Sequence, residues 1–352
     1  MHEDIVKILL PTLLSFAVGV AVTPILTHFL YKYKVWKKKG GKIALDGKEA
    51  VEFNKLHKDN EVKTPRMGGV VIWLPVFIVA LTIWTMSKIW PNAASLKLDL
   101  ISRSQTWIPL FVFAVGAIVG FVSDLFDISY KDKELKFTWR LLIVTILSGF
   151  VGWWFYSKLA VDAVSVPFYG YLYLGMLIVP FFIILNIVLY SSGIIDGIDG
   201  LSGGVFLFIF LAYSAIAFIQ NQIDLAAFCA TVAGSLMAFL WFNIPPARFY
   251  MTETGSMALT LAIATVAFMT DKMGGGVGLS VLPVIGFLLF FTVASAGFQV
   301  LSKRFWGRKL FRIAPAHHHF EAVGWPSYKV TMRYWLLGIM FAFAGVLLAL
   351  LV

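Results

Sequence analysis

Residues 171–190 read YLYLGMLIVPFFIILNIVLY, a run without a single charged side chain. About 20 apolar residues in a helix are enough to cross the hydrocarbon core of a bilayer, so this stretch predicts a transmembrane helix. Similar runs recur along the chain, and the sequence predicts an all-α integral membrane protein with about ten transmembrane helices in one polytopic domain, 1–352. The predicted spans are 5–30, 69–87, 107–122, 141–157, 171–190, 201–219, 223–242, 255–270, 279–301 and 332–352.

The overall composition supports the same class of protein. Hydrophobic residues make up 59% of the 352 residues and charged residues only 14%, whereas soluble domains have about 25% charged residues. The single cysteine, Cys229, excludes an intrachain disulfide.

The basic residues predict how the chain is oriented in the membrane. Of the 29 Lys and Arg residues, 23 lie within five predicted loops or at the span ends next to them. These loops are about 31–67, 123–140, 191–200, 243–254 and 302–331. The positive-inside rule places these loops in the cytoplasm and both termini outside. The net charge of +10 favours anionic membrane lipid or a polyanionic substrate. Nucleic acid is not expected as a partner, because no soluble basic domain is present to bind it.

The last of these loops contains three adjacent histidines, His317, His318 and His319, between apolar neighbours. Imidazoles change charge near neutral pH and bind phosphate when protonated, so the cluster predicts a site for a phosphate-rich substrate. A surface polar run is the alternative. Zinc is less expected, because adjacent histidines cannot all point to one ion and Cys229 is remote in sequence.

Acidic residues gather in the loops on the same side. Asp196 and Asp199 are each followed by glycine in a loop without a cation, which predicts oxygen ligands for Mg²⁺; a plain Asp-Gly turn is the alternative. Asp124 lies at a predicted span end, where it could be merely solvated. Glu253 begins another span, where it could simply cap the helix. Arg66, with Lys63, precedes a glycine pair in a turn of the kind that binds anions; ordinary close packing of glycines at a span entry is the alternative.

Together these loops resemble the phospho-N-acetylmuramoyl-pentapeptide transferases, a branch of the polyprenyl-phosphate sugar-1-phosphate transferases. The resemblance runs along the whole chain and is carried, in family order, by the motifs TPRMGG at 64–69, DGIDG at 196–200, TGS at 254–256 and PAHHHFE at 315–321. It implies Mg²⁺-dependent transfer of phospho-MurNAc-pentapeptide from UDP-MurNAc-pentapeptide to undecaprenyl phosphate, giving lipid I and UMP for peptidoglycan synthesis. It also implies a multi-pass protein of the bacterial cytoplasmic membrane with its site on the cytoplasmic face, and it is compatible with a homodimer.

The resemblance also implies roles for individual residues. Asp124 is the expected base or its neighbour, and Glu253 and Asp199 are the expected metal ligands. His318 is expected to be catalytic, and Tyr250 to stack on uracil. The other residues expected to bind substrate are Lys63, Arg66, Asp196, Asp199, Asn243, Gln299, His317 and His319.

The chain departs from the family pattern at six positions. Ser123 stands for an aspartate, Gly193 for an asparagine, Arg66 for a threonine, and Thr252-Glu253 for the usual Gly-Asp. Asp127 matches an acidic position of the wider group, where this branch commonly has lysine. These departures leave two alternatives: a sister transferase using another UDP-sugar such as UDP-GlcNAc, or a non-catalytic homologue that binds lipid or nucleotide. A secondary transporter is less expected, because the polar residues lie at one membrane interface and not near the bilayer midplane.

Overall fold

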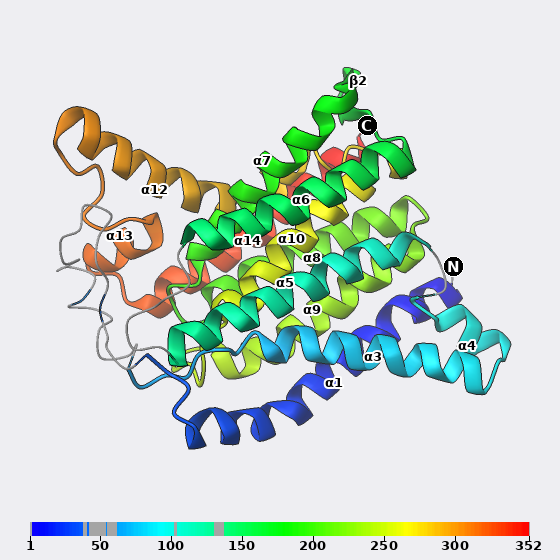
Figure 1. Cartoon of the computed structure of the whole chain (residues 1–352), viewed down its shortest axis with the longest axis horizontal. Helices are drawn as coiled ribbons and strands as arrows, with labels where there is room; N and C mark the ends of the chain where they lie inside the picture. Colours follow the sequence, from blue (N-terminus) through cyan, green and yellow to red (C-terminus); the bar gives the residue numbers. More distant parts are fainter. Residues whose placement is uncertain are drawn as a thin grey trace.

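The computed structural model describes residues 2–37, 41, 54, 62–101, 104–129 and 137–351. Much of the predicted loops 31–67 and 123–140 lies outside these ranges. The described chain is almost entirely helical (Figure 1). Its α-helices are α1 (His2–Lys32), α3 (Val70–Ile89), α4 (Ala93–Leu98), α5 (Ser104–Ser129), α6 (Phe137–Leu159), α7 (Ile178–Ser191), α8 (Leu201–Ile219), α9 (Ile223–Asn243), α10 (Thr252–Met269), α11 (Leu282–Ile285), α12 (Phe287–Trp306), α13 (Ala316–Ala322) and α14 (Ser327–Leu350). Strands β1 (Ala163–Val166) and β2 (Gly170–Tyr173) form an antiparallel hairpin, and short 3-10 helices occupy Gly175–Leu177, Ser192–Ile195 and Lys272–Gly274.

Within the described ranges, nine helices are long and apolar enough to cross a membrane. This confirms the all-α membrane class, because a chain in a bilayer must satisfy its backbone hydrogen bonds within each helix. The predicted span 279–301 differs from the structure. Residues 279–281 form a turn, and the remainder is divided between α11 and α12 at Gly286. Pro283 is the second residue of α11, and proline and glycine are the residues least favourable to a continuous helix.

The two ends of the helix bundle carry different segments of the chain. The chain termini and the β1–β2 hairpin lie at one end of the molecule, whereas α13 and the connections α7–α8 and α9–α10 lie at the other (Figure 1). The described parts of the five predicted loops therefore share one end, opposite the termini. That this end faces the cytoplasm stays a prediction.

Helix α10 lies at the centre of the bundle and packs very closely against α3 and α5. A Cβ added to Gly69 would lie 2.2 Å from the backbone nitrogen of Gly255, and one added to Gly120 would lie 2.1 Å from the carbonyl oxygen of Glu253. Any side chain at these two positions would therefore collide with the backbone of α10, and small residues of this kind let membrane helices pack backbone against backbone. The first turn of α10 is thereby pressed against α5, which brings Glu253 and Asp124 into one site.

Candidate active site

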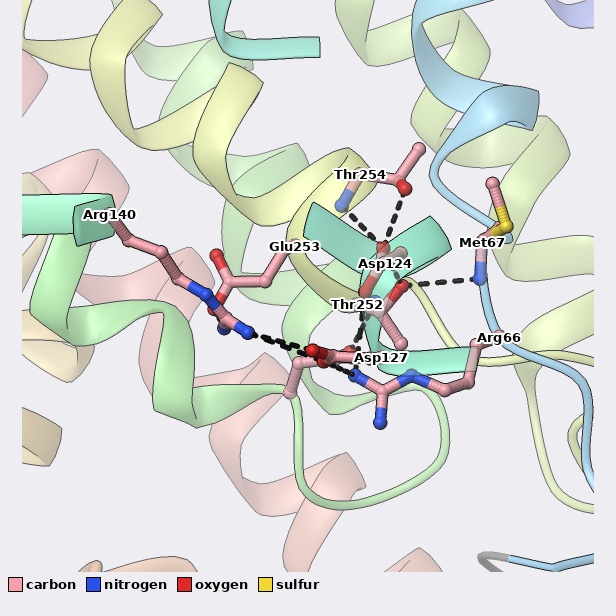
Figure 2. A network of polar contacts seen from close by, with 9 residues as sticks. Arg66, Met67, Asp124, Asp127, Arg140, Thr252, Glu253 and Thr254 are labelled. Carbon is pink, nitrogen blue, oxygen red and sulfur yellow. Dashed lines mark hydrogen bonds and ion pairs between the residues drawn. The ribbon is translucent and has the colours of Figure 1, made fainter. Parts of the chain in front are cut away.

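Asp124, on α5, is fully buried and held by the first turn of α10 (Figure 2). Its Oδ2 accepts hydrogen bonds from the Thr252 hydroxyl at 2.5 Å and from the amide and hydroxyl of Thr254 at 2.8 and 2.6 Å. Its Oδ1 lies 3.4 Å from Nη2 of Arg66. Three donors on one oxygen fix the carboxylate strongly, so Oδ1 is the oxygen that faces the remaining charges of the site.

Thr252 connects its own loop, 243–254, to three other predicted loops. Its hydroxyl donates to Asp124 and accepts from the amide of Met67 at 3.1 Å, while its own amide donates to Oδ2 of Asp196 at 2.8 Å. Its φ is +56°, which is a true outlier for a β-branched residue. Such backbone strain persists only where the surrounding contacts enforce it, and it is concentrated at functional sites.

Two arginines bridge the acidic side chains (Figure 2). Arg140, at the start of α6, donates from Nη1 to Oε1 of Glu253 at 2.9 Å and from Nη2 to Oδ1 of Asp127 at 3.1 Å. Arg66 reaches the other oxygen of Asp127 at 3.4 Å. The cluster thus contains three carboxylates and two guanidinium groups: Asp124, Asp127, Glu253, Arg66 and Arg140. It is largely buried and carries one formal negative charge in excess. A further cation would balance this charge.

The Glu253 carboxylate has one unused oxygen. Oε2 is buried, and no described residue forms a hydrogen bond to it. No three His, Cys, Asp or Glu side chains in the described ranges come together as a group that could hold a metal ion. The described contacts of Asp199, the second predicted ligand, are to other residues: its carboxylate accepts from the amide of Ala247 at 3.0 Å and its carbonyl from the hydroxyl of Thr331.

Asp196 lies within the same network. It accepts from the hydroxyl of Ser202 at 2.7 Å and from the amide of Thr252. Burial raises the pKa of its carboxyl group above the ordinary value, and the two hydrogen bonds oppose this effect. Asp196 thus links the 191–200 loop to the residues around Asp124.

The three histidines have different surroundings. Nδ1 of His318 lies 2.8 Å from Oε2 of Glu321, whose other oxygen accepts from the hydroxyl of Ser327. A Cβ at Gly197 would lie 2.5 Å from Nε2 of His318 and 3.0 Å from Nε2 of His317. Both imidazoles therefore face the 191–200 loop. His319 instead accepts from the amide of Arg312 at 3.2 Å, because successive residues of α13 point in different directions.

Two predicted substrate contacts are engaged with backbone groups. Asn243 is buried, and its amide accepts from the nitrogen of Gly200 at 2.9 Å and donates to the carbonyl of Phe249 at 2.7 Å. Gln299 accepts from the amides of Leu310 and Phe311 and donates to the carbonyl of Phe311. Both side chains hold loops in position.

The remaining predicted residues lie nearer the surface. Tyr250 is half-buried, and its backbone pairs with Pro65 and Gly68, which joins the 243–254 loop to the glycine turn. Lys63 is exposed.

Two members of the charge cluster were not predicted as site residues. Arg140 stands where a basic loop meets a span, and Asp127 follows Asp124 by one helical turn. For Arg140 the signal in the sequence was a charge at a span boundary, whereas Asp127 also lies three residues after Asp124 on the same helical face and matches an acidic position of the wider transferase group.

The chain matches the sequence pattern described as Glycosyl transferase family 4 over residues 106–271, which include Asp124 and Glu253. It is 31% identical to the phospho-N-acetylmuramoyl-pentapeptide-transferase of Levilactobacillus brevis, over 97% of this chain and 98% of the relative. The protein of the same name from Geobacillus thermodenitrificans is 31% identical over 98% of both chains. That from Clostridium perfringens strain 13 is 32% identical over 96% of this chain and 97% of the relative.

Proposed function

Because this chain belongs to the phospho-N-acetylmuramoyl-pentapeptide transferases, we propose that it transfers phospho-MurNAc-pentapeptide from UDP-MurNAc-pentapeptide to undecaprenyl phosphate. The products are lipid I and UMP. The observation that carries the proposal is the buried cluster of Asp124, Asp127, Glu253, Arg66 and Arg140 at the loop end of a membrane bundle. A site there can receive a soluble nucleotide sugar and a membrane-bound acceptor together.

The reaction exchanges one phosphoanhydride for another. An oxygen of the lipid phosphate attacks the phosphorus that carries the sugar, and the bond from that phosphorus to UMP breaks. Phosphoryl transfer of this kind depends mainly on positioning and on neutralising the phosphate charge. Arg66 and Arg140 supply fixed cations for this purpose, and His317 and His318 face the adjacent loop as further donors.

Asp124 is proposed to act through Oδ1. Its Oδ2 is occupied by Thr252 and Thr254, so only Oδ1 can take a proton from the acceptor phosphate. An entering phosphate would compete for Arg66, which now lies beside Oδ1. Substrate binding would thereby free the base at the point where it is needed.

Mg²⁺ is proposed as the cofactor. The residues present fit a hard cation: the cluster has one excess negative charge, and Oε2 of Glu253 is buried without a hydrogen-bond partner among the described residues. Glu253 would hold the ion, with Asp199 as the second predicted ligand. Bound Mg²⁺ would neutralise phosphate oxygens of the substrate.

The test is release of UMP by the purified full-length protein in detergent, with Mg²⁺, undecaprenyl phosphate and UDP-MurNAc-pentapeptide. UDP-GlcNAc is assayed in parallel, because Asp127 matches the acidic position of the wider transferase group and favours a sister activity as the second candidate. Release with UDP-GlcNAc alone would reassign the substrate. Binding of both substrates without release of UMP would support the non-catalytic alternative.

A further inference from the structure

Tyr190 is the penultimate residue of α7, shortly before the turn that carries Asp196. Its side chain is only 5% exposed. The ring is stacked on Phe137 at the start of α6, with 6.2 Å between centroids and 18° between planes. The packing fixes the direction of the phenol, so its hydroxyl has a defined position.

That hydroxyl has no hydrogen-bond partner among the residues that the structure describes. A buried hydroxyl without a partner costs free energy, so its presence requires an explanation. The phenol is close enough to the Glu253 carboxylate and the Arg140 guanidinium to interact with both, electrostatically and as a weak hydrogen-bond neighbour, so it lies beside the charge cluster.

The same two neighbours carry other unsatisfied polar atoms. Nε of Arg140 and Oε2 of Glu253 are also buried without a hydrogen-bond partner in the described part of the chain. Three elements, α6, α7 and α10, thus present two donors and one acceptor at one place. No hydrogen bond of good geometry joins these three atoms to one another, so their full hydrogen-bonding capacity is left for a ligand.

We propose that the Tyr190 hydroxyl donates a hydrogen bond to a phosphoryl oxygen of the bound substrate, beside the Nε–H group of Arg140. The phosphoryl group belongs either to the nucleotide diphosphate or to the lipid phosphate. The ligand class rests on the proposed function. Tyr190 is the last residue of the predicted span 171–190, where no sequence pattern marked it as a site residue.

The test compares Tyr190→Phe with Tyr213→Phe in the full-length protein. Tyr190→Phe removes the hydroxyl and keeps the ring on Phe137. Tyr213 is the matched control: it is equally buried, but its hydroxyl donates to the carbonyl of Gly278 at 2.9 Å, far from the charge cluster. For each variant, the dissociation constants for UDP and for dodecyl phosphate are measured by calorimetry, together with the thermal unfolding midpoint.

Tyr190→Phe is expected to weaken binding of one probe by about 10-fold or more, since the lost hydrogen bond is to a charged group. Its unfolding midpoint should fall less than that of Tyr213→Phe, because the Tyr190 hydroxyl forms no hydrogen bond of good geometry with the described residues. Tyr213→Phe should lower the midpoint and leave both affinities unchanged. Weaker binding of UDP assigns Tyr190 to the nucleotide, and weaker binding of dodecyl phosphate assigns it to the acceptor.

Two results would overturn the proposal. One is affinity within twofold of wild type for both probes, and the other is a fall in the midpoint like that of Tyr213→Phe with both affinities unchanged, which would make the hydroxyl structural. These measurements need no turnover. Failure of the wild-type protein to release UMP would therefore refute the proposed function, whereas the measured affinities would still show whether Tyr190 contacts a phosphoryl ligand.

Discussion

The guanidinium of Arg66 lies 3.4 Å from the carboxylate of Asp127. Both positions depart from the family pattern, which has threonine at the first and commonly lysine at the second. The cation expected at 127 is therefore supplied here from the glycine turn, and the two departures form one ion pair. The positive charge lies at position 66 in place of position 127, and Asp127 neutralises it.

Asp127→Lys is expected to be strongly destabilising by itself. The new cation would face both Arg66 and Arg140, and loss of one partner of a buried charge network costs about 3–5 kcal/mol. Asp127→Lys combined with Arg66→Thr restores the family pattern and should recover much of this loss. Thermal unfolding and UMP release measure both effects. Independent, additive effects of the two substitutions would show that the pair is not coupled.

Glu253→Gln should lower turnover by on the order of 10² or more, because charge stabilisation by a metal contributes several kcal/mol. The shape of the side chain is nearly preserved, and Arg140 keeps its contact with Asp127. The assay is turnover across a Mg²⁺ titration, in which a ligand role also predicts a higher Mg²⁺ requirement. Glu253→Asp is the companion variant: it keeps the charge and shortens the side chain, and so tests whether the carboxylate must extend as far as that of Glu253. Wild-type turnover with unchanged Mg²⁺ dependence in the Gln variant would return Glu253 to the role of a helix cap.

The histidines should differ in importance. His318 is oriented by Glu321 and faces Gly197, so His318→Ala should lower turnover at least tenfold, and Glu321→Gln should do so less severely. His319→Ala is the control, because His319 contacts the amide of Arg312 and its loss should affect turnover only a few-fold. Equal effects of the two alanine variants in stably folded protein would mean that the cluster acts through structure alone.

Asp196 predicts a pH dependence of stability. Burial raises the pKa of this carboxyl group in the folded protein. The folded state therefore holds the proton more tightly than the unfolded state, and the associated stability is fully present below the unfolded pKa and is lost as pH rises through the folded pKa. Relative to Asp196→Asn, the wild-type protein should gain stability as the pH is lowered through the folded pKa of Asp196. Unfolding midpoints of both proteins, measured from neutral pH down toward the ordinary pKa of an aspartate, test this, and parallel curves would contradict it.

The sequence by itself determined the class of protein and the location of the site at the loops. Apolar runs such as 171–190 become helices because the bilayer offers the backbone no other partner, so composition over about 20 residues suffices. The motifs containing Asp196, Glu253 and His318 could be found for a similar reason: residues that carry chemistry stand out in short polar loops between apolar spans. The division of the run 279–301 at Gly286 was less visible, since its apolar residues continue across the break.

Only the tertiary structure decided which residues are partners. Asp124 is held by threonines about 130 positions later in the chain, and Arg140 meets Glu253 across a sequence separation of 113. Asn243 and Gln299 are typical ligand-binding residues in sequence, yet their amides are used to hold loops. Local sequence sets the helices, whereas these contacts depend on how closely distant helices pack. The glycines at 69 and 120 allow that approach, and it is the approach that places the carboxylates and arginines in one cluster.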